Sequence, residues 1–150
     1  MNIAVFTGAS SGMGQEFVRQ IVSKDVAFGK KSFDEVWLIA RRTERLQALA
    51  DTLPIPARIF TMDLTDRAAI KNVYRQALSK EKPNVRILVN ASGFGKFGAF
   101  TEIPCEENDG MLDLNAGALV SMTYETLPYM CAGSQIYELC SLSSFQPVPY

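Results

Sequence analysis

The chain has 150 residues, and its 47% hydrophobic and 21% charged residues are the proportions of a soluble globular protein that forms one domain. Its formal net charge of -1 gives no general attraction to nucleic acid or to an anionic membrane, so any phosphate must be bound locally. The chain contains no histidine, which excludes Ser-His-Asp hydrolysis, histidine metal clusters and acid/base catalysis by imidazole within these residues.

Cysteine usage and the first residues of the chain bear on its location. Cys105, Cys131 and Cys140 are odd in number and form no Cys-x-x-Cys pair, a pattern that favours reduced thiols and argues against a structural zinc site. The start of the chain lacks a basic leader, and no stretch approaches the roughly 18 apolar residues of a membrane span. We therefore expect a cytoplasmic protein with no metal site and no membrane partner.

Short apolar runs alternate with helical patterns along the chain, which is the order typical of a parallel sheet covered by helices. The predicted strands are residues 3–6, 36–40, 58–62, 87–89 and 135–141. Helices are predicted from Gly12, after Thr43 as a capping residue, after the capping residues 63–66, and over 106–130, with a long connector at 23–34. The third of these helices has one apolar stripe, which comprises Ile70, Val73, Tyr74, Ala77 and Leu78.

Five strands in this rhythm predict an α/β fold, namely one Rossmann-type domain over residues 1–150 with a doubly wound parallel sheet of strand order 3-2-1-4-5. Right-handed crossovers place the first and fourth strands side by side and leave a crevice at their carboxyl ends, where a dinucleotide would bind. The segment 106–130 is apolar on most faces, so we expect that helix to be covered on more than one side.

The strongest local signal is the turn Thr7-Gly8-Ala9-Ser10-Ser11-Gly12-Met13-Gly14, which joins the first strand to the first helix. Gly8 permits a sharp turn, Gly12 lets the main chain approach a pyrophosphate, and Gly14 permits close packing of helix on strand. Main-chain amides at the helix start and the Ser10 and Ser11 hydroxyls would hold the phosphates. A plain strand-to-helix turn also carries glycine and serine, but three glycines at this spacing favour the phosphate site.

The spacing Gly-x-x-x-Gly-x-Gly resembles that of the short-chain dehydrogenase/reductase family, and later segments resemble the family's motifs in the same order. Asp63-Leu64 is similar to the family's pair that contacts adenine, although an aspartate here is also suited to capping a helix. Asn90-Ala91-Ser92-Gly93 is similar to the family's Asn-Asn-Ala-Gly segment, which supports the central sheet and lines the nicotinamide-ribose side. By itself this segment is also compatible with a simple strand-end turn.

Two further matches imply catalytic residues. Asn115 lies in Leu114-Asn115-Ala116, which resembles the family's helix bearing an active-site asparagine that joins a water to a proton relay. A structural asparagine with satisfied hydrogen bonds is the alternative, because an unpaired buried amide costs about 1–3 kcal/mol. Ser141 stands where the family has the serine that orients the substrate carbonyl, and Cys140 replaces the serine before it in a position that we expect to be buried.

The end of the second strand indicates which nicotinamide nucleotide would bind. NAD-dependent folds place an acidic residue there to bond the ribose hydroxyls, whereas this chain has Ala40 followed by Arg41 and Arg42. Planar guanidinium groups suit a 2′-phosphate, so NADP(H) is favoured over NAD(H). Two solvated arginines before a helix are the alternative interpretation.

The family's Tyr-x-x-x-Lys pair is absent from the chain. Its tyrosine would come about 13 residues after the serine, at position 154, and Tyr150 in the turn after Gln146 is interpreted as a loop residue. The resemblance thus implies an NADP(H)-dependent oxidoreductase acting on a small carbonyl or alcohol substrate, expected as a homo-oligomer with exposed apolar surface in this truncated, inactive form. Alternatives are a non-catalytic nucleotide-binding regulatory or interaction module, and an epimerase or dehydratase of the extended family.

Overall fold

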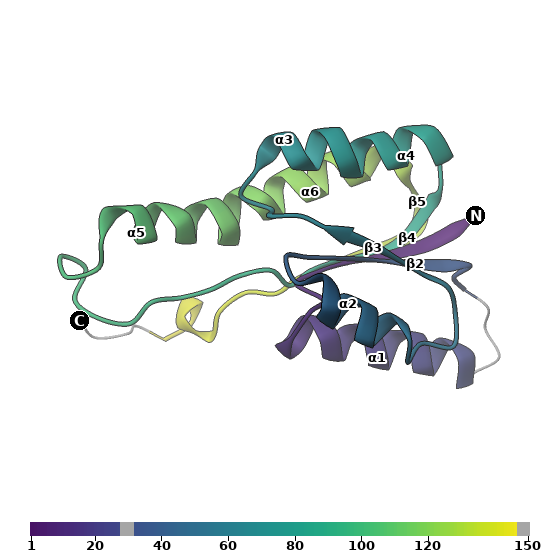
Figure 1. The fold of residues 1–150 in the computed structure, drawn as a ribbon, viewed down its shortest axis with the longest axis horizontal. Helices are drawn as coiled ribbons and strands as arrows, with labels where there is room; N and C mark the ends of the chain where they lie inside the picture. The colour runs from purple at the N-terminus through teal and green to yellow at the C-terminus, as the bar shows by residue number, and fades with distance from the viewer. Residues whose placement is uncertain (28–31, 147–150) are drawn as a thin grey trace.

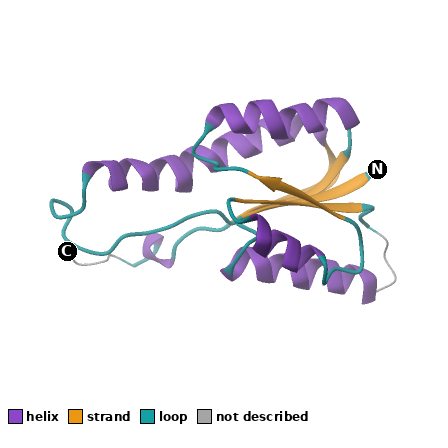
Figure 2. Cartoon of the chain, in the orientation of Figure 1, coloured by secondary structure: helices purple, strands orange, loops and turns teal. Residues whose placement is uncertain are grey.

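The computed structural model describes residues 1–27 and 32–146, in which a five-stranded parallel sheet has helices on both faces (Figures 1 and 2). The strand order is β3-β2-β1-β4-β5, as predicted for a doubly wound sheet. Every neighbouring pair is parallel, so the carboxyl ends of the strands meet at one edge. The strands are β1 (Asn2–Thr7), β2 (Glu35–Ala40), β3 (Ala57–Thr61), β4 (Asn84–Asn90) and β5 (Met130–Glu138).

The helices form two layers around this sheet. In Figure 1, α1 and α2 cover one face, and α3, α4 and α6 cover the other, with α5 extending beyond the sheet. The helices are α1 (Gly12–Ala27), α2 (Thr43–Ala50), α3 (Arg67–Ala69), α4 (Gln76–Glu81), α5 (Cys105–Leu112) and α6 (Leu119–Thr126). The π-helical segments η1 (Ile70–Arg75) and η2 (Asp113–Ala118) join α3 to α4 and α5 to α6, and the short 3-10 turns are η3 (Leu127–Tyr129) and η4 (Leu142–Ser144).

Alternation along the central strand divides the core into two clusters. Ile3 and Val5 of β1 are fully buried with Trp37 on the face covered by α4 and α6, whereas Ala4 and Phe6 are fully buried on the face covered by α1 and α2. Side chains of a strand point to opposite faces in turn, so a strand with apolar residues at every position must be covered on both sides. β1 and β2 are such strands, and they hold the centre of the sheet in place.

Several boundaries differ from the sequence predictions, and the fourth and fifth strands begin earlier than predicted, at Asn84 and Met130. The predicted connector 23–34 begins too early, because α1 continues to Ala27; residues 28–31 lie outside the described part of the chain. Thr43 does not cap α2, since the helix begins at Thr43 itself and its hydroxyl bonds that of Thr61 at 2.7 Å. The fifth strand ends at Glu138 and not at residue 141, because its partner β4 ends at Asn90, the last residue in register.

The long helical segments contain wider turns that the sequence pattern does not reveal. Ile70, Tyr74 and Leu78 are buried as predicted, but Val73 is 45% exposed. These three lie four residues apart, and the π-helical turn of η1 carries the intervening Val73 off the buried stripe. The prediction that the helix over 106–130 is covered on more than one side is wrong. Its apolar residues Leu112, Val120, Tyr124 and Leu127 are largely exposed.

Within residues 1–27 and 32–146, no helix has the length and apolar character needed to cross a membrane. Cys105, Cys131 and Cys140 are free thiols. All three are exposed, and the expected burial of Cys140 is wrong because the edge strand β5 that precedes it has no buried residue.

Candidate nucleotide-binding site

The glycine-rich turn after β1 has the main-chain geometry that its spacing predicts. Gly8 and Gly12 have φ values of +65° and +55°, in the left-handed region that favours glycine. A Cβ on Gly8 would lie 2.6 Å from the Ala91 carbonyl oxygen, and one on Gly14 would lie 2.4 Å from the Gly8 carbonyl oxygen. A Cβ on Gly12 would meet nothing within 4 Å, so the main chain there faces open space. The turn is therefore tightly packed at Gly8 and Gly14 and open to solvent at Gly12.

The open side of this turn is the start of α1. The first N–H groups of an α-helix have no partner within the helix, and the helix dipole makes this end favourable for an anion. Gly12, Met13 and Gly14 form that first turn, and all three line a cavity of about 280 Å³. The arrangement offers a phosphate group several main-chain donors without a side chain in the way.

The cavity gathers the carboxyl ends of four strands, as the crevice of a doubly wound sheet should. Thirteen of the fourteen residues predicted to bind a cofactor line it, and the exception is Asn90. The lining residues are Gly8, Ser10, Ser11, Gly12, Met13, Gly14, Ala40, Arg41, Arg42, Met62, Asp63, Leu64, Ala91, Ser92, Gly93 and Leu114.

A buried threonine joins the ends of the two central strands. The Thr7 side chain is 1% exposed, and its hydroxyl oxygen accepts hydrogen bonds from the main-chain N–H groups of Ala91 (3.0 Å) and Ser92 (3.2 Å). These contacts hold the segment after β4 against the glycine-rich turn. The sequence pattern did not indicate this role directly, although a threonine at the end of an otherwise apolar strand is the signal that reveals it.

The two arginines after β2 differ in their contacts. Arg42 Nη2 donates to the hydroxyl oxygens of Ser11 (2.9 Å) and Ser10 (3.3 Å), so this guanidinium reaches from the end of β2 to the glycine-rich turn. Arg41 Nη1 lies 3.8 Å from an Asp63 carboxylate oxygen, and its side chain is 74% exposed. Ala40 before them is buried and carries no acidic group. The end of β2 therefore presents positive charge beside the serine hydroxyls.

Asp63 does not cap the helix that follows it, although capping was the alternative interpretation of this residue. Asp66 caps α3, because its carboxylate accepts from the N–H groups of Ala68 and Ala69. The Asp63 carboxylate instead accepts from the N–H and the hydroxyl of Thr65, at 2.9 Å and 2.8 Å. The Thr65 main-chain bond is the main cause that lowers the pKa of Asp63 below its usual value, with further help from the Thr65 hydroxyl and from Arg41. Asp63 is therefore held as a carboxylate at the edge of the cavity.

Asn90 supports the sheet from behind the cavity. Its Nδ2 donates to Thr123 Oγ1 (3.1 Å) and to Glu138 Oε1 (3.2 Å), so it joins β4 to α6 and to the end of β5. Asn90 Oδ1 is buried and has no hydrogen-bond partner among the described residues. This position accords with the supporting role that the family resemblance implied for the start of the Asn90–Gly93 segment.

The two predicted catalytic residues are not among the residues that line the cavity. Asn115 is exposed rather than buried, in the π-helical segment η2, and its side chain exchanges two hydrogen bonds with the Phe94 main chain, at 2.9 Å and 2.8 Å. Ser141 follows β5 as the N-cap of η4, and its hydroxyl oxygen accepts from the Ser143 N–H at 3.1 Å. In the part of the chain that the structure describes, these two side chains thus have separate partners. Their catalytic roles remain predictions. Tyr150 lies outside the described residues.

Three residues that line the cavity are not among the predicted site residues, and all three, Ala40, Met62 and Leu114, are apolar. Met62 follows β3, and Leu114 precedes Asn115 in η2. Apolar side chains near a core are ordinarily packing residues, so only the position of Met62 directly before Asp63 could have indicated a role. Leu114 reaches the cavity from a helix that is far away in the sequence, which no local pattern predicts.

Comparison with known proteins agrees with this geometry. The chain is 29% identical to an uncharacterized oxidoreductase of Staphylococcus epidermidis over 147 residues, which are 97% of this chain and 60% of that protein. It is 34% identical over 129 residues to the NADP-dependent 3-hydroxy acid dehydrogenase YdfG of Escherichia coli strain K12, covering 85% of this chain and 48% of that protein. A structure of serine dehydrogenase in its closed form, complexed with NADP+, matches with a TM-score of 0.81 and 30% identity, covering 97% of this chain and 56% of that one.

The chain thus spans 48% to 60% of the length of these relatives. The family model described as short chain dehydrogenase matches residues 2–150. Because that match covers nearly the whole chain and the turn, strand order and cavity fit it, the protein belongs to the short-chain dehydrogenase family.

Proposed function

We propose that the cavity binds NADP(H), with the diphosphate on the start of α1 and the 2′-phosphate beside the arginines after β2. The observation that supports this most directly is the open main chain at Gly12, in a cavity that also contains Arg41 and Arg42. Arg42 already contacts Ser10 and Ser11, which leaves a cluster of donors where a 2′-phosphate would lie. An acidic residue that would repel this phosphate is absent from the end of β2, where Ala40 stands.

The whole protein is proposed to transfer a hydride between the nicotinamide and a small carbonyl or alcohol substrate. Ser141 would donate a hydrogen bond from its hydroxyl to the substrate oxygen and so orient the carbonyl. The Ser141 oxygen accepts from Ser143 N–H, which leaves the hydroxyl hydrogen available for this bond. Asn115 would act at the same end of the site, where it now holds the loop at Phe94. NADP-dependent dehydrogenases among the relatives support this assignment.

Calorimetric titration with NADPH and NADH tests the proposed cofactor directly. We expect NADPH to bind at least about tenfold more tightly, because hydrogen bonds to charged groups contribute about 1.5–3 kcal/mol. Arg42→Ala should remove most of that preference, and Arg41→Ala a smaller part, with NADH affinity little changed. Arg45→Ala is the matched control, since Arg45 is an exposed arginine of α2 that does not line the cavity. Equal binding of the two nucleotides would contradict the assignment.

The chain of 150 residues is proposed to lack turnover, because it has no Tyr-x-x-x-Lys pair after Ser141. Incubation with NADPH and a panel of aldehydes and ketones, followed at the absorbance of NADPH, should show no oxidation above the rate without protein. Reduction of a carbonyl by the purified chain would disprove this statement and leave the binding proposal intact.

Self-association is also proposed, at the apolar surface of α6 and the residues beside it. Val120, Tyr124 and Leu127 are 64%, 73% and 52% exposed, and such side chains gain free energy when they are covered. Light scattering should therefore report a mass above that of one chain. A monomer at all concentrations would refute this part of the proposal. A reducing, cytoplasmic location remains our expectation for three free thiols.

A further inference from the structure

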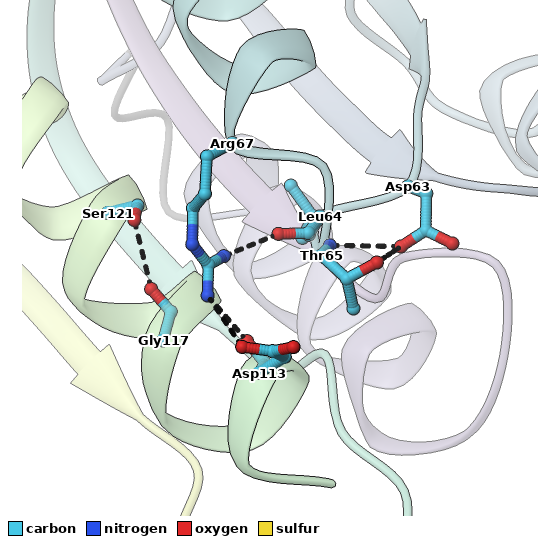
Figure 3. A network of polar contacts seen from close by, with 7 residues as sticks. All are labelled: Asp63, Leu64, Thr65, Arg67, Asp113, Gly117 and Ser121. Carbon is cyan, nitrogen blue, oxygen red and sulfur yellow. Dashed lines mark hydrogen bonds and ion pairs between the residues drawn. The ribbon is translucent and has the colours of Figure 1, made fainter. Parts of the chain in front are cut away.

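One arginine joins two segments of the cavity wall from behind. Leu64 and Leu114 line the cavity, whereas Arg67 does not. Arg67 Nη1 donates to the main-chain oxygen of Leu64 at 2.7 Å, and Arg67 Nη2 donates to the main-chain oxygen of Asp113 at 2.9 Å. Figure 3 shows the guanidinium between the loop after β3 and the helical segment η2. A single planar group therefore holds the loop at Leu64 and the helix turn before Leu114.

The guanidinium lies where a side chain at position 117 would begin. A Cβ on Gly117 would lie 2.0 Å from Arg67 Nη2 and 3.1 Å from Arg67 Cζ, so the guanidinium would have to move away from its present position. The Asp113 carboxylate lies 3.8 Å from the same Nη2 and adds an ion pair at the surface. Ser121 Oγ donates to the Gly117 oxygen at 3.0 Å, which further holds this turn (Figure 3). The Arg67 guanidinium thus packs directly against the main chain at Gly117.

We call the two hydrogen bonds from Arg67 to Leu64 and Asp113 the Arg67 bridge, and its Asp113 end lies in a π-helical segment. π-helical turns are rare, are frequent at functional sites, and place main-chain oxygens out of the usual helical alignment. Arg67 supplies a donor to Asp113, the first residue of η2, and Asn115 lies two residues further on. An arginine fork can donate to two oxygens at a fixed separation, which a lysine ammonium on a flexible stem cannot do as well.

We propose that Arg67 is a positioning residue that fixes the separation of Leu64 and Leu114, and so the width of the adenosine end of the cavity. This rests on the proposed function, which places the 2′-phosphate beside the arginines after β2, and on the family resemblance, by which Asp63 and Leu64 would contact the adenine. Arg67 touches no nucleotide itself, and it acts through the main chain of the two segments that it joins.

Adenosine 2′,5′-bisphosphate is the probe, because it carries the adenosine and 2′-phosphate groups without nicotinamide. Arg67→Met and Arg67→Lys should both weaken its affinity about tenfold, a coupling of ordinary size. Arg75→Met is the matched control. Arg75 Nε lies 3.5 Å from Glu125 Oε2, so it also joins η1 to α6, but it reaches neither cavity segment. A loss of affinity in Arg75→Met equal to that in Arg67→Met would overturn the proposal, because general destabilisation would then explain both.

A double-mutant cycle gives a second readout that a purely structural role would not reproduce. Gly117→Ala should weaken binding of the probe by a similar factor, because its Cβ displaces the guanidinium. In the Arg67→Met background, Gly117→Ala should add no more than about a twofold loss. Losses that multiply in the double variant would show that the two residues act independently, and would overturn the bridge.

Hydrogen exchange without ligand separates failure of this inference from failure of the proposed function. Arg67→Met should accelerate exchange at the Thr65 amide, which bonds Asp63, and at the amides of residues 113–118. If the parent chain does not bind the probe but these amides respond, the nucleotide assignment fails and the bridge remains. If the parent chain binds the probe while Arg67→Met and Arg67→Lys change neither affinity nor exchange, the bridge fails and the nucleotide site remains.

Discussion

The two ends of the site are built in different ways. At the phosphate end, Gly8 and Gly14 let main-chain atoms approach so closely that a Cβ would lie within 2.6 Å of a carbonyl oxygen. At the opposite end, the segments after β4 and β5 extend beyond the sheet (Figure 2), and Phe97 and Phe145 are each 89% exposed. The phosphate end is therefore fixed by its own backbone. The opposite end is held by a few side-chain contacts, such as the Asn115 hydrogen bonds to Phe94 and the Lys96–Glu107 ion pair.

The largest expected effect on stability is a difference between two glycine-to-alanine substitutions, one at each end of the site. Gly14→Ala should cost about 3 kcal/mol of stability and abolish nucleotide binding, because its Cβ would lie 2.4 Å from the Gly8 oxygen, which cannot move away. Gly95→Ala should change stability by less than about 0.5 kcal/mol, since a Cβ there meets nothing within 4 Å. Urea unfolding measures both. Similar losses for the two variants would contradict the contrast between the ends.

The buried threonine of the phosphate end comes next in size. Thr7→Val keeps the shape of the side chain but removes the acceptor of the Ala91 and Ser92 amides, so we expect a loss of about 2 kcal/mol. Thr43→Val is the control, because its hydroxyl bonds Thr61 at the surface, and its effect should stay below about 0.5 kcal/mol. Thermal unfolding compares the two. An unchanged midpoint for Thr7→Val would show that water or another group satisfies the amides.

At the opposite end, Asn115 should have a smaller and more local effect. Asn115→Ala removes both hydrogen bonds to the Phe94 main chain, and we expect a cost of about 1 kcal/mol because the residue is exposed. Exchange of the Phe94 amide should become faster, while affinity for adenosine 2′,5′-bisphosphate should not change. A large loss of that affinity would mean that the two ends are not as separate as their contacts indicate.

The smallest effect concerns acid sensitivity at Asp63. Its pKa is lowered in the folded chain, chiefly by the Thr65 N–H bond, so the carboxylate stabilises the fold above its unfolded pKa of about 3.9. This contribution is lost as the pH falls through the lower folded pKa. Asp63→Asn should therefore make stability less dependent on pH below about pH 4 while leaving other titrations in place. A parallel acid unfolding curve for the variant and the parent would contradict the assigned shift.

Local requirements explain why the phosphate end could be predicted from the sequence. Gly8, Gly12 and Gly14 are needed by the turn itself, so their spacing carries the information in one short stretch. The same is true of the strand order, because continuous apolar runs separated by helical patterns leave few arrangements. Together, the glycine spacing, the family resemblance and the two arginines after the second strand predict thirteen of the residues that line the cavity.

The features that could not be predicted depend on contacts between distant segments. Leu114 reaches the cavity because Arg67 holds η2 against the loop after β3, a contact across 46 positions. Val73 is exposed because a π-helical turn interrupts the regular spacing, and the residue types of η1 give no sign of it. The fifth strand ends early because β4 provides no further partner. Each outcome is decided by a neighbour rather than by local propensity.

The close fit of Arg67 against Gly117 has an evolutionary consequence. A lineage that replaces Gly117 with alanine would place a methyl group 2.0 Å from Arg67 Nη2, so the arginine would lose its function in the same step. The two positions should therefore change together among descendants of this protein, with arginine found only opposite glycine. Natural variation at this pair would record whether a lineage still needs the two segments held at one separation.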